Sequence, residues 1–319
     1  MADQLSRMLG ERPWLLADGA TGTNLYNMGL APGQAPDLWC ESQPEKVRDL
    51  HRQMIAAGAD VILTNSFGAN ANRLRLSGAA DRVAAVNRAA ARLARDCARE
   101  SGRAVVVAGS IGPTGEIMAP MGRLTEAEAT ELFTTQAQAL KEGGVDVLWV
   151  ETISAAEEFR AFARAAQAVA MPWCGMMSFE SAGRSMMGVT PPQLSALIDR
   201  LPNPPIAYGA NCGTGPAELL RAVAGFAASG CERSYIAKPN AGVPRYHEDG
   251  LVYDATPAAM AEFAVLARDM GVRIIGGCCG TTPAHLAAMR QALVEAPRGP
   301  RPSAELVSAR IAAAMTRPE

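Results

Sequence analysis

Short apolar runs rich in β-branched residues recur eight times along the chain. The clearest are DVILTN, AVVVAG and DVLWVE, which show no alternation of polar and apolar positions. Runs of this kind are typical of strands buried on both faces, as in parallel sheets covered by helices. The predicted strands are 14–17, 60–65, 104–109, 146–151, 172–178, 206–211, 234–239 and 272–276.

The segments between these strands are rich in Ala, Arg and Glu at helical spacing. Two of them carry start signals. Thr125 and Glu128 fit a capping box, and Thr282 followed by Pro283 fits an N-cap before the first helical residue. The predicted helices are 44–57, 81–101, 125–141, 155–170, 191–200, 216–228, 256–269 and 282–293.

Eight strand–helix units follow one another without a break in composition, and their strands begin about 37 residues apart on average. This alternation favours an α/β fold with a single closed (β/α)8 (TIM) barrel over an open doubly wound sheet. We expect the barrel to span residues 1–295. The extension 296–319 begins with a Pro/Arg linker, APRGPRPS, and its segment 304–315 is expected to form a short helix. This helix would pack on the barrel or on a second copy in a homo-oligomer.

The composition excludes several classes of protein. Hydrophobic residues make up 49% and charged residues 19% of the 319 positions, which is typical of a globular protein with a large core. The formal net charge of −2 provides no basic field for nucleic acid, and no apolar run reaches the roughly 18 residues that a membrane span needs. The first residues lack the pattern of a signal peptide, so we expect a cytoplasmic protein whose seven cysteines form no disulfide framework.

Residues with distinctive chemistry fall at the predicted carboxyl ends of five strands. In a barrel these ends surround one mouth, where the active site lies. No single residue carries this argument, because it rests on their shared position. They are Asp18 and Gly19 after the first strand, Asn65 at the end of the second, Glu151 at the end of the fourth, Asn211 and Cys212 at the sixth, and Gly276–Gly280 after the eighth.

Cys212, Cys278 and Cys279 are expected at this mouth. Glycines flank the Cys278–Cys279 pair and would let both sulfurs point to one side, and the helix that starts nearby favours thiolates. Three thiolates would bind Zn²⁺ and leave a fourth position open, as in catalytic zinc sites. Ordinary buried cysteines and a vicinal redox pair are the alternatives. The remaining cysteines are interpreted as inert: Cys40, Cys97, Cys174 and Cys231.

Zinc held by three thiolates suits a soft fourth ligand, such as a substrate thiol that zinc would keep deprotonated at neutral pH. The chemistry that follows is attack by the thiolate on an electrophilic carbon such as an activated methyl group. Asp18 and Glu151 would hold the ammonium group of an amino-acid thiol, and the N–H groups around Gly19 would receive its carboxylate. The alternative for Asp18-Gly19 is a simple strand-to-helix turn.

Five segments, DGATGT, ADVILTNSF, ET, GANCGTGP and GGCCGTTPAHL, lie in this order between residues 18 and 286. Together they resemble the homocysteine S-methyltransferase family, which includes betaine-dependent and S-methylmethionine-dependent enzymes and a module of cobalamin-dependent methionine synthase. The resemblance implies a zinc site made by Cys212, Cys278 and Cys279, and methyl transfer to the zinc-bound thiolate of L-homocysteine, giving L-methionine. It also implies a catalytic role for Glu151 and places homocysteine among residues of the matching segments: Asp18, Gly19, Thr64, Asn65, Glu151 and Asn211.

The resemblance suggests a small onium compound as the methyl donor. The segments APDLWCE and GRSMMGVTP look most like bacterial proteins assigned to glycine betaine, and Trp39 and Phe67 would offer aromatic faces to a quaternary ammonium group. The betaine enzymes of animals carry tyrosines where this chain has Gly68 and Thr152, so S-methylmethionine and S-adenosylmethionine remain alternative donors. A homocysteine-binding module that works with a separate methyl-corrinoid protein is a further alternative.

Overall fold

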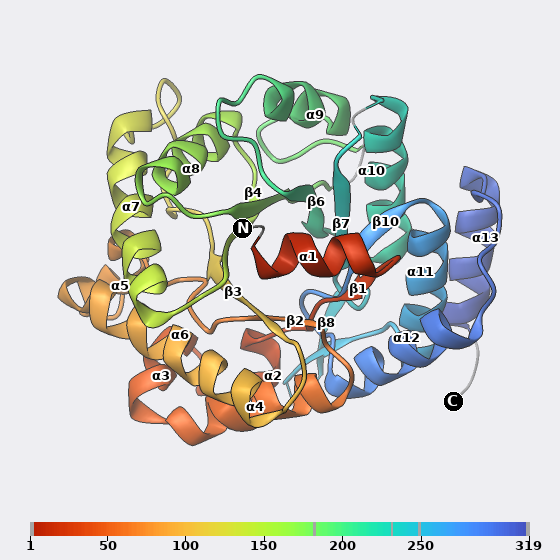
Figure 1. Ribbon diagram of the computed structural model, residues 1–319, viewed down its shortest axis with the longest axis horizontal. Helices are drawn as coiled ribbons and strands as arrows, with labels where there is room; N and C mark the ends of the chain where they lie inside the picture. The colour runs from red at the N-terminus through yellow and green to blue at the C-terminus, as the bar shows by residue number, and fades with distance from the viewer. Residues whose placement is uncertain (1–2, 181–182, 231, 248–249, 317–319) are drawn as a thin grey trace.

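Parallel strands form a barrel at the centre of the molecule, and helices surround it (Figure 1). The computed structural model describes residues 3–180, 183–230, 232–247 and 250–316. Around the barrel the strands follow the order β1-β10-β7-β6-β5-β4-β3-β2, and a parallel bridge between Ala17 and Val61 joins the two ends. The predicted (β/α)8 barrel is therefore confirmed. Its strands are β1 (Leu15–Leu16), β2 (Val61–Leu63), β3 (Val106–Ile111), β4 (Val147–Ile153), β5 (Trp173–Met177), β6 (Ala207–Cys212), β7 (Ser234–Pro239) and β10 (Val272–Ile275).

Alternate residues of the strands fill the inside of the barrel, as the two-residue period of a strand requires. Trp149 and Ile236 belong to this inner core. Helix α1 (Gln4–Glu11) closes the end of the barrel where the strands begin, called the base below, and it buries Leu5 and Met8 in the same cluster. This helix was not among the predicted elements, because its eight residues offer little more than two turns of apolar spacing.

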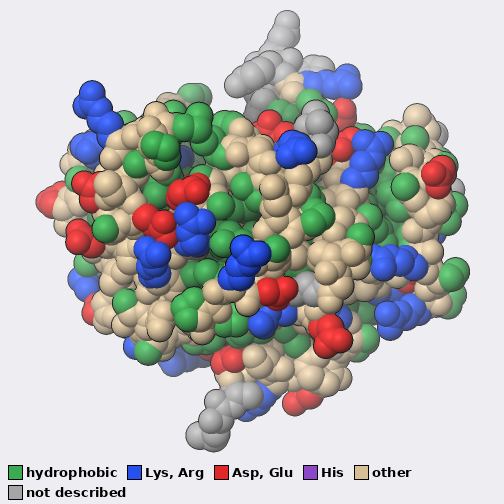
Figure 2. All heavy atoms as spheres, turned by 90° about the horizontal axis from the view of Figure 1, so that it is seen from above, with side chains coloured by type: hydrophobic (Ala, Val, Ile, Leu, Met, Phe, Trp, Pro, Cys, Tyr) green, Lys and Arg blue, Asp and Glu red, His purple; other side chains and the backbone are tan. Residues whose placement is uncertain are grey.

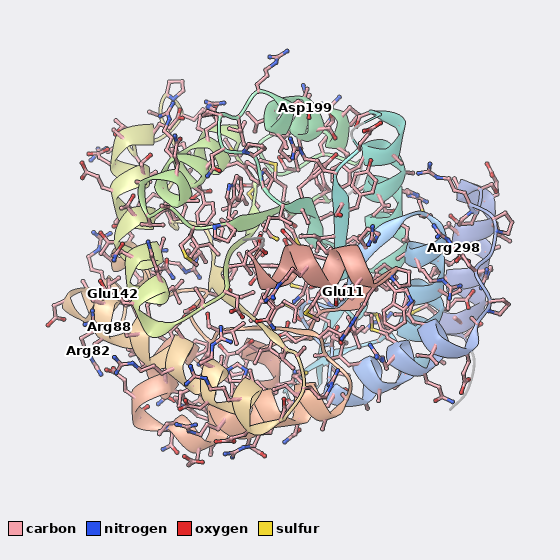
Figure 3. All side chains as sticks on the ribbon, in the orientation of Figure 1. Glu11, Arg82, Arg88, Glu142, Asp199 and Arg298 are labelled. Carbon is pink, nitrogen blue, oxygen red and sulfur yellow. The ribbon has the colours of Figure 1, made fainter. Side chains whose placement is uncertain are left out.

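All eight helices predicted between the strands are present, with ends shifted by a few residues. The capping box of Thr125 and Glu128 is formed as expected. Neighbouring helices of the outer ring are linked by ion pairs such as that of Arg88 with Glu142, which lie side by side in Figure 3. The helices are α4 (Pro44–Ala56), α6 (Val83–Glu100), α7 (Glu126–Gly143), α8 (Ala156–Ala168), α9 (Pro191–Asp199), α10 (Pro216–Ala228), α11 (Pro257–Asp269) and α12 (Pro283–Glu295).

Several short elements lie in the connections that follow the strands, and they were not predicted. After β7 the chain forms an antiparallel hairpin of β8 (Pro244–His247) and β9 (Gly250–Tyr253). The others are α2 (Gly22–Asn27), η1 (Pro36–Leu38), α3 (Trp39–Ser42), α5 (Ala71–Arg75) and η2 (Ala80–Arg82). Segments this short carry no recognisable period, and their structure depends on the barrel beneath them.

The C-terminal segment forms α13 (Ala304–Met315) with the predicted bounds. Ser303 caps it by accepting a hydrogen bond from the Leu306 N–H. The helix packs on α10 and α11 of its own chain and buries Val307 and Ile311 there. The helix was expected to pack either on the barrel or on a second copy, and the structure shows it on the barrel of its own chain.

Acidic and basic side chains are interspersed on the face shown in Figure 2, as expected from the small net charge. Within the described residues, no helix combines the length and apolar character that crossing a membrane requires.

Candidate active site

Three cysteines meet at the carboxyl ends of the barrel strands. Cys212 is the last residue of β6, and Cys278 and Cys279 follow β10. Their three Sγ atoms all lie within 4.8 Å of one another, and each residue is partly exposed. The structure thus brings together the cysteines that the sequence analysis assigned to one cluster.

The backbone around these sulfurs is held in a special conformation. Cys212 has φ 65°, in the left-handed region that a residue with a side chain rarely adopts, and Gly213 follows with φ 71°. On the opposite side, the Cys278 N–H donates to the Pro239 carbonyl at 2.7 Å, and the Cys279 N–H donates to Oδ1 of Asn240 at 3.0 Å. Strain of this kind persists where the surrounding structure fixes a functional geometry.

The thiols of this cluster resist deprotonation in the absence of a cation. Hydrogen bonding with Cys212 raises the pKa of the Cys278 thiol, and burial adds to the effect. For Cys279 the hydrogen bond to Cys212 lowers the pKa, but the neighbouring Cys278 and burial outweigh it and raise the value to about 12. Thiolates this close together would repel one another, and a bound cation would offset the repulsion. Three converging sulfurs fit a soft divalent ion such as zinc.

Two buried carboxylates, Asp18 after β1 and Glu151 in β4, lie at the same end of the barrel. Asp18 accepts the Leu63 N–H at 2.7 Å and forms an ion pair of 2.8 Å with the ammonium of Lys238. Glu151 accepts the Ser110 hydroxyl at 2.6 Å. The expected carboxylate pair is therefore present, together with a lysine that the sequence analysis did not consider.

The charges of this group depend on one another. Burial lowers the pKa of Lys238, but the attraction of Asp18 and Glu151 outweighs it and keeps the pKa above its usual value. Burial raises the pKa of Glu151, against the opposing effects of Lys238 and Ser110. Lys238 is thus a buried cation, and Glu151 is a carboxylate whose charge is only partly compensated.

Asn211 and Thr64 connect the site to the strands beneath it. Asn211 accepts the Thr152 N–H at 2.8 Å, and its Nδ2 lies 3.6 Å from the Cys278 sulfur. Thr64 accepts the Ser110 N–H at 3.0 Å and so supports the residue that holds Glu151. Both predicted residues therefore hold other groups of the site in place.

Gly19, in the loop after β1, lies against Thr281 in the loop that follows β10 and carries Cys278 and Cys279. A Cβ at this position would stand 2.5 Å from the Thr281 carbonyl oxygen, so only glycine permits the approach. The Gly280 N–H donates to the Thr23 hydroxyl at 3.1 Å and joins the two loops a second time. The DGATGT segment is thereby fixed beside the sulfurs.

Asn65, Trp39 and Phe67 each contact another segment of the chain. Asn65 donates to the Pro36 carbonyl at 2.8 Å. Trp39 is buried in α3 with the Lys46 ammonium 4.8 Å from its ring centroid, and the Arg73 guanidinium lies 5.6 Å from the Phe67 centroid. Each aromatic ring therefore already carries a cation of the chain on one face.

Sequence reasoning missed four residues of the site, although one signal was available for Lys238. It follows the apolar residues of SYIAKP near the end of its strand, as Glu151 follows those of DVLWVE. The missed residues are Ser110, Lys238, Asn240 and Tyr253; Tyr253 packs closely on Gly280 beside the cysteines.

The cysteines interpreted as inert lie outside the cluster where the structure describes them. Cys40, Cys97 and Cys174 are buried, and Cys231 lies outside the described residues.

Comparison with protein families gives a match over most of the chain. Residues 15–293 match the family described as homocysteine S-methyltransferase. Methionine synthase of Mycobacterium tuberculosis is 30% identical over 309 residues, and that of Mycobacterium leprae is 29% identical over 310 residues. These alignments include 90% and 91% of this chain, but the chain spans only 25% of the length of either relative.

Solved structures agree on the fold. The metallated form of the homocysteine methyltransferase MmuM from Escherichia coli superimposes with a TM-score of 0.77 at 24% identity, covering 91% of this chain and 99% of that one. Its oxidized form gives a TM-score of 0.74 at 25% identity, with the same coverage. The barrel described above is thus shared over the full length of that enzyme.

Proposed function

Because this chain belongs to the homocysteine S-methyltransferase family, we propose that it moves a methyl group from a small onium donor to the sulfur of L-homocysteine, giving L-methionine, with zinc as its metal. The observation that carries the proposal is the convergence of three cysteine sulfurs within 4.8 Å, beside two buried carboxylates. A soft metal position next to an ammonium receptor suits a substrate that is both a thiol and an amino acid.

The metal ligands in this proposal are Cys212, Cys278 and Cys279. Bound there, zinc supplies a fourth coordination position that keeps a thiol deprotonated and nucleophilic at neutral pH. The chain itself orients the substrate. Glu151 and its neighbour Asp18 form the ammonium side of the pocket, and the backbone of the Gly19 loop is proposed to receive the carboxylate.

The reaction needs no proton transfer at the donor. The homocysteine sulfur forms a bond to the methyl carbon, and the bond from that carbon to the positively charged nitrogen or sulfur of the donor breaks. The donor leaves as a neutral amine or thioether with the electron pair. The task of the protein is therefore to align the two substrates and to exclude water, and the buried mouth residues serve this task.

Glycine betaine is the donor we propose first, on the basis of the segments around Trp39 and Met186. One face of Trp39 carries Lys46 and one face of Phe67 carries Arg73, so a quaternary ammonium group would have to use the opposite faces. The same faces could receive a sulfonium group, so S-methylmethionine and S-adenosylmethionine are the alternatives.

A donor panel tests the proposal. The zinc-loaded protein is incubated with homocysteine and, separately, with glycine betaine, S-methylmethionine, S-adenosylmethionine or dimethylsulfoniopropionate, and methionine is measured by mass spectrometry. Methionine together with dimethylglycine establishes betaine, whereas methionine from sulfonium compounds alone replaces betaine and keeps the remainder of the proposal. Absence of methionine with every small donor contradicts it.

A second candidate is a homocysteine-binding module served by a methyl-corrinoid protein. Large apolar side chains stand exposed on the connections that follow three strands, namely Leu76, Met121 and Met186 at 85%, 77% and 75% exposure. The chain also spans only a quarter of its methionine synthase relatives. Methionine formed only after addition of a methylated corrinoid protein would favour this candidate.

A further inference from the structure

Lys238 is the buried cation of the mouth. Its side chain is 2% exposed, and it lies two residues after the inner-core residue Ile236, so it points to the inside of the barrel. Its ammonium lies 5.9 Å from the centroid of the Trp149 ring, which belongs to that inner core. A lysine is fully buried only when other groups compensate its charge, so its partners define its role.

The partners of Lys238 divide the two carboxylates into different roles. Both oxygens of Asp18 are engaged, one by the Lys238 ammonium at 2.8 Å and the other by the Leu63 N–H at 2.7 Å. Glu151 accepts one hydrogen bond, from Ser110, on Oε1. Among the described residues none donates to its other oxygen, so Glu151 retains an acceptor for a ligand.

The charge count gives the same division. With both carboxylates ionised, Asp18, Glu151 and Lys238 together carry a net charge of −1, and burial makes this charge unfavourable and raises the pKa of both carboxyl groups. One substrate ammonium restores neutrality on this side. The arrangement therefore fits a ligand with a single cationic group placed against Glu151.

We propose that Lys238 is a positioning residue that reserves Glu151 for the ammonium of homocysteine by holding Asp18 in an internal ion pair. The inference rests on the proposed function, and it modifies the expectation that Asp18 and Glu151 share the ammonium. Asp18 then acts through Lys238: without Asp18, the lysine would turn to Glu151 and compete with the substrate. Without Lys238, the two carboxylates would repel each other and Glu151 would hold a proton more readily.

A double-mutant cycle tests this arrangement. Binding of L-homocysteine to the metal-loaded chain is measured by calorimetry without any donor, for Lys238→Met, Asp18→Asn, the double variant and Glu151→Gln. Each of the first two single variants is expected to weaken binding about 10-fold, and Glu151→Gln about 100-fold. In the Lys238→Met background, Asp18→Asn should instead restore binding to within about 3-fold of wild type, because the net charge returns to −1.

A second ligand separates positioning from a general structural role. 4-Mercaptobutyrate has the thiol, carbon chain and carboxylate of homocysteine but lacks the ammonium. The double variant should keep the wild-type preference for homocysteine over this thiol, and Glu151→Gln should lose it. If Asp18→Asn weakens binding by the same factor in both backgrounds, or if the double variant loses the preference, Asp18 contacts the ammonium directly and the inference is wrong.

Folding and chemistry are checked separately. Circular dichroism and metal content are recorded for every variant, and Lys238→Gln replaces Lys238→Met if the latter does not fold. The double variant leaves neither partner charged and is expected to fold. Because binding is measured without a donor, a chain that binds homocysteine as described but forms no methionine contradicts only the proposed function.

Discussion

The two ends of the barrel each bury an aspartate, but they surround it with different partners. At the base, Asp60 is completely buried and accepts hydrogen bonds from Arg12, Arg103 and Arg290 and from the Leu16 N–H. These arginine side chains are more than one third exposed, so water solvates the charge that Asp60 does not balance. Asp60 is therefore compensated in excess by groups of the chain itself.

At the mouth the balance is reversed. Asp18 and Glu151 share one lysine, and the three nearby sulfurs have no cation of the chain among their described hydrogen-bond partners. This contrast indicates where ligands are needed. The base is complete as the chain folds, whereas the mouth reaches neutrality only with a metal and a substrate ammonium.

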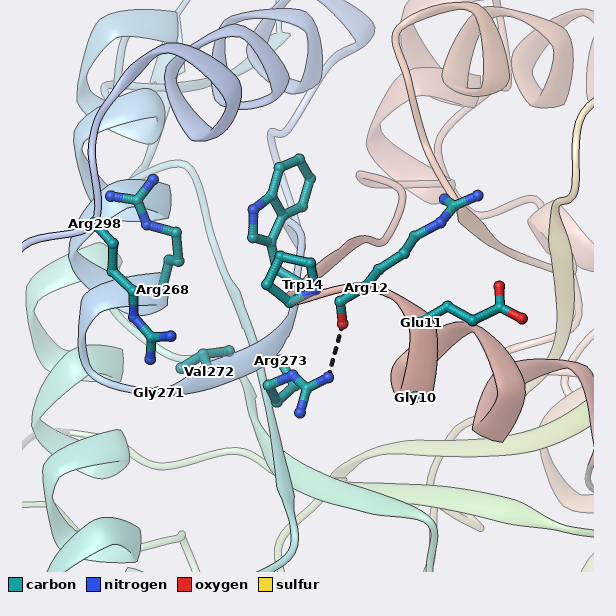
Figure 4. A pocket seen from close by; sticks show the side chains of 10 residues that line it. Gly10, Glu11, Arg12, Trp14, Arg268, Gly271, Val272, Arg273 and Arg298 are labelled. Atoms are coloured by element: carbon teal, nitrogen blue, oxygen red, sulfur yellow. Dashed lines mark hydrogen bonds between the residues drawn. The ribbon is translucent and has the colours of Figure 1, made fainter.

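A cavity of about 450 Å³ at the base supports this contrast (Figure 4). Its arginines are engaged with the backbone: Arg273 donates to the Arg12 carbonyl at 2.8 Å, and Arg268 donates to the carbonyls of Ala296 and Pro297. These bonds tie the end of α1 and the C-terminal linker to the barrel. A roomy cavity is thus no sign of the reactive end in this protein.

The largest effect is expected from breaking the sulfur cluster. Cys278→Ser should reduce bound zinc from about one per chain to a small fraction and lower methionine formation about 100-fold or more, because two sulfurs hold the ion poorly. Metal analysis and turnover measure this. Cys97→Ser, a change at a buried cysteine outside the cluster, is the matched control and should keep both. Full turnover in Cys278→Ser would contradict the metal assignment.

The next largest effect is expected from a substitution at the base, which should change the stability of the fold but not ligand binding. Asp60→Ala leaves three arginines and the Leu16 N–H without their shared acceptor and should lower the free energy of unfolding by about 3 kcal/mol. Urea denaturation measures the loss. Binding of zinc and homocysteine should be nearly unchanged under conditions where the variant is folded. A stable variant with impaired binding would remove the contrast between the two ends.

Glu151→Gln should have the opposite effect on stability. Burial raises the pKa of Glu151, so the charged form is unfavourable in the metal-free, substrate-free fold, while glutamine can still accept the Ser110 hydroxyl. The variant is expected to gain roughly 1 kcal/mol at neutral pH, although it binds homocysteine poorly. Denaturant unfolding of the free protein tests this.

The raised pKa of Glu151 also gives the sign with which the stability difference between wild type and Glu151→Gln depends on pH. As pH falls through the folded-state pKa of Glu151 toward the ordinary value of 4.5, the native state takes up the proton before the unfolded state does. Wild type should therefore gain stability relative to Glu151→Gln as the pH is lowered through that window. A constant difference between the two proteins across this range would show that the charge of Glu151 has no cost in the fold.

The smallest effect concerns a residue at the mouth end that does not face the site. Thr125 caps α7 with its exposed hydroxyl, and Thr125→Ala should lower the free energy of unfolding by about 1 kcal/mol with unchanged turnover. Thermal unfolding and a methionine assay measure the two quantities. A strong loss of turnover would mean that the site extends to the outer ring of helices.

Much of this protein follows from its sequence, because local patterns report local structure. Apolar runs of strand length and helical spacing between them predict the eight barrel strands and the eight helices that follow them, and the shared geometry of parallel strands places Asp18, Glu151, Cys212 and the Cys278–Cys279 pair at one mouth. The glycines around Cys278 and Cys279 already indicated a turn, which the structure shows at Gly280 with φ 79°.

Other features required the closed barrel. Lys238 meets Asp18 across 220 residues only because β7 and β1 both flank β10, and no periodicity encodes such a meeting. The cations on Trp39 and Phe67, the β8–β9 hairpin and the helix α1 beneath the barrel likewise depend on neighbours distant in the sequence or on segments too short to show a pattern. The elements and the end of the barrel that carries the chemistry therefore follow from local sequence patterns, whereas the pairing of charges at that end depends on the closed barrel.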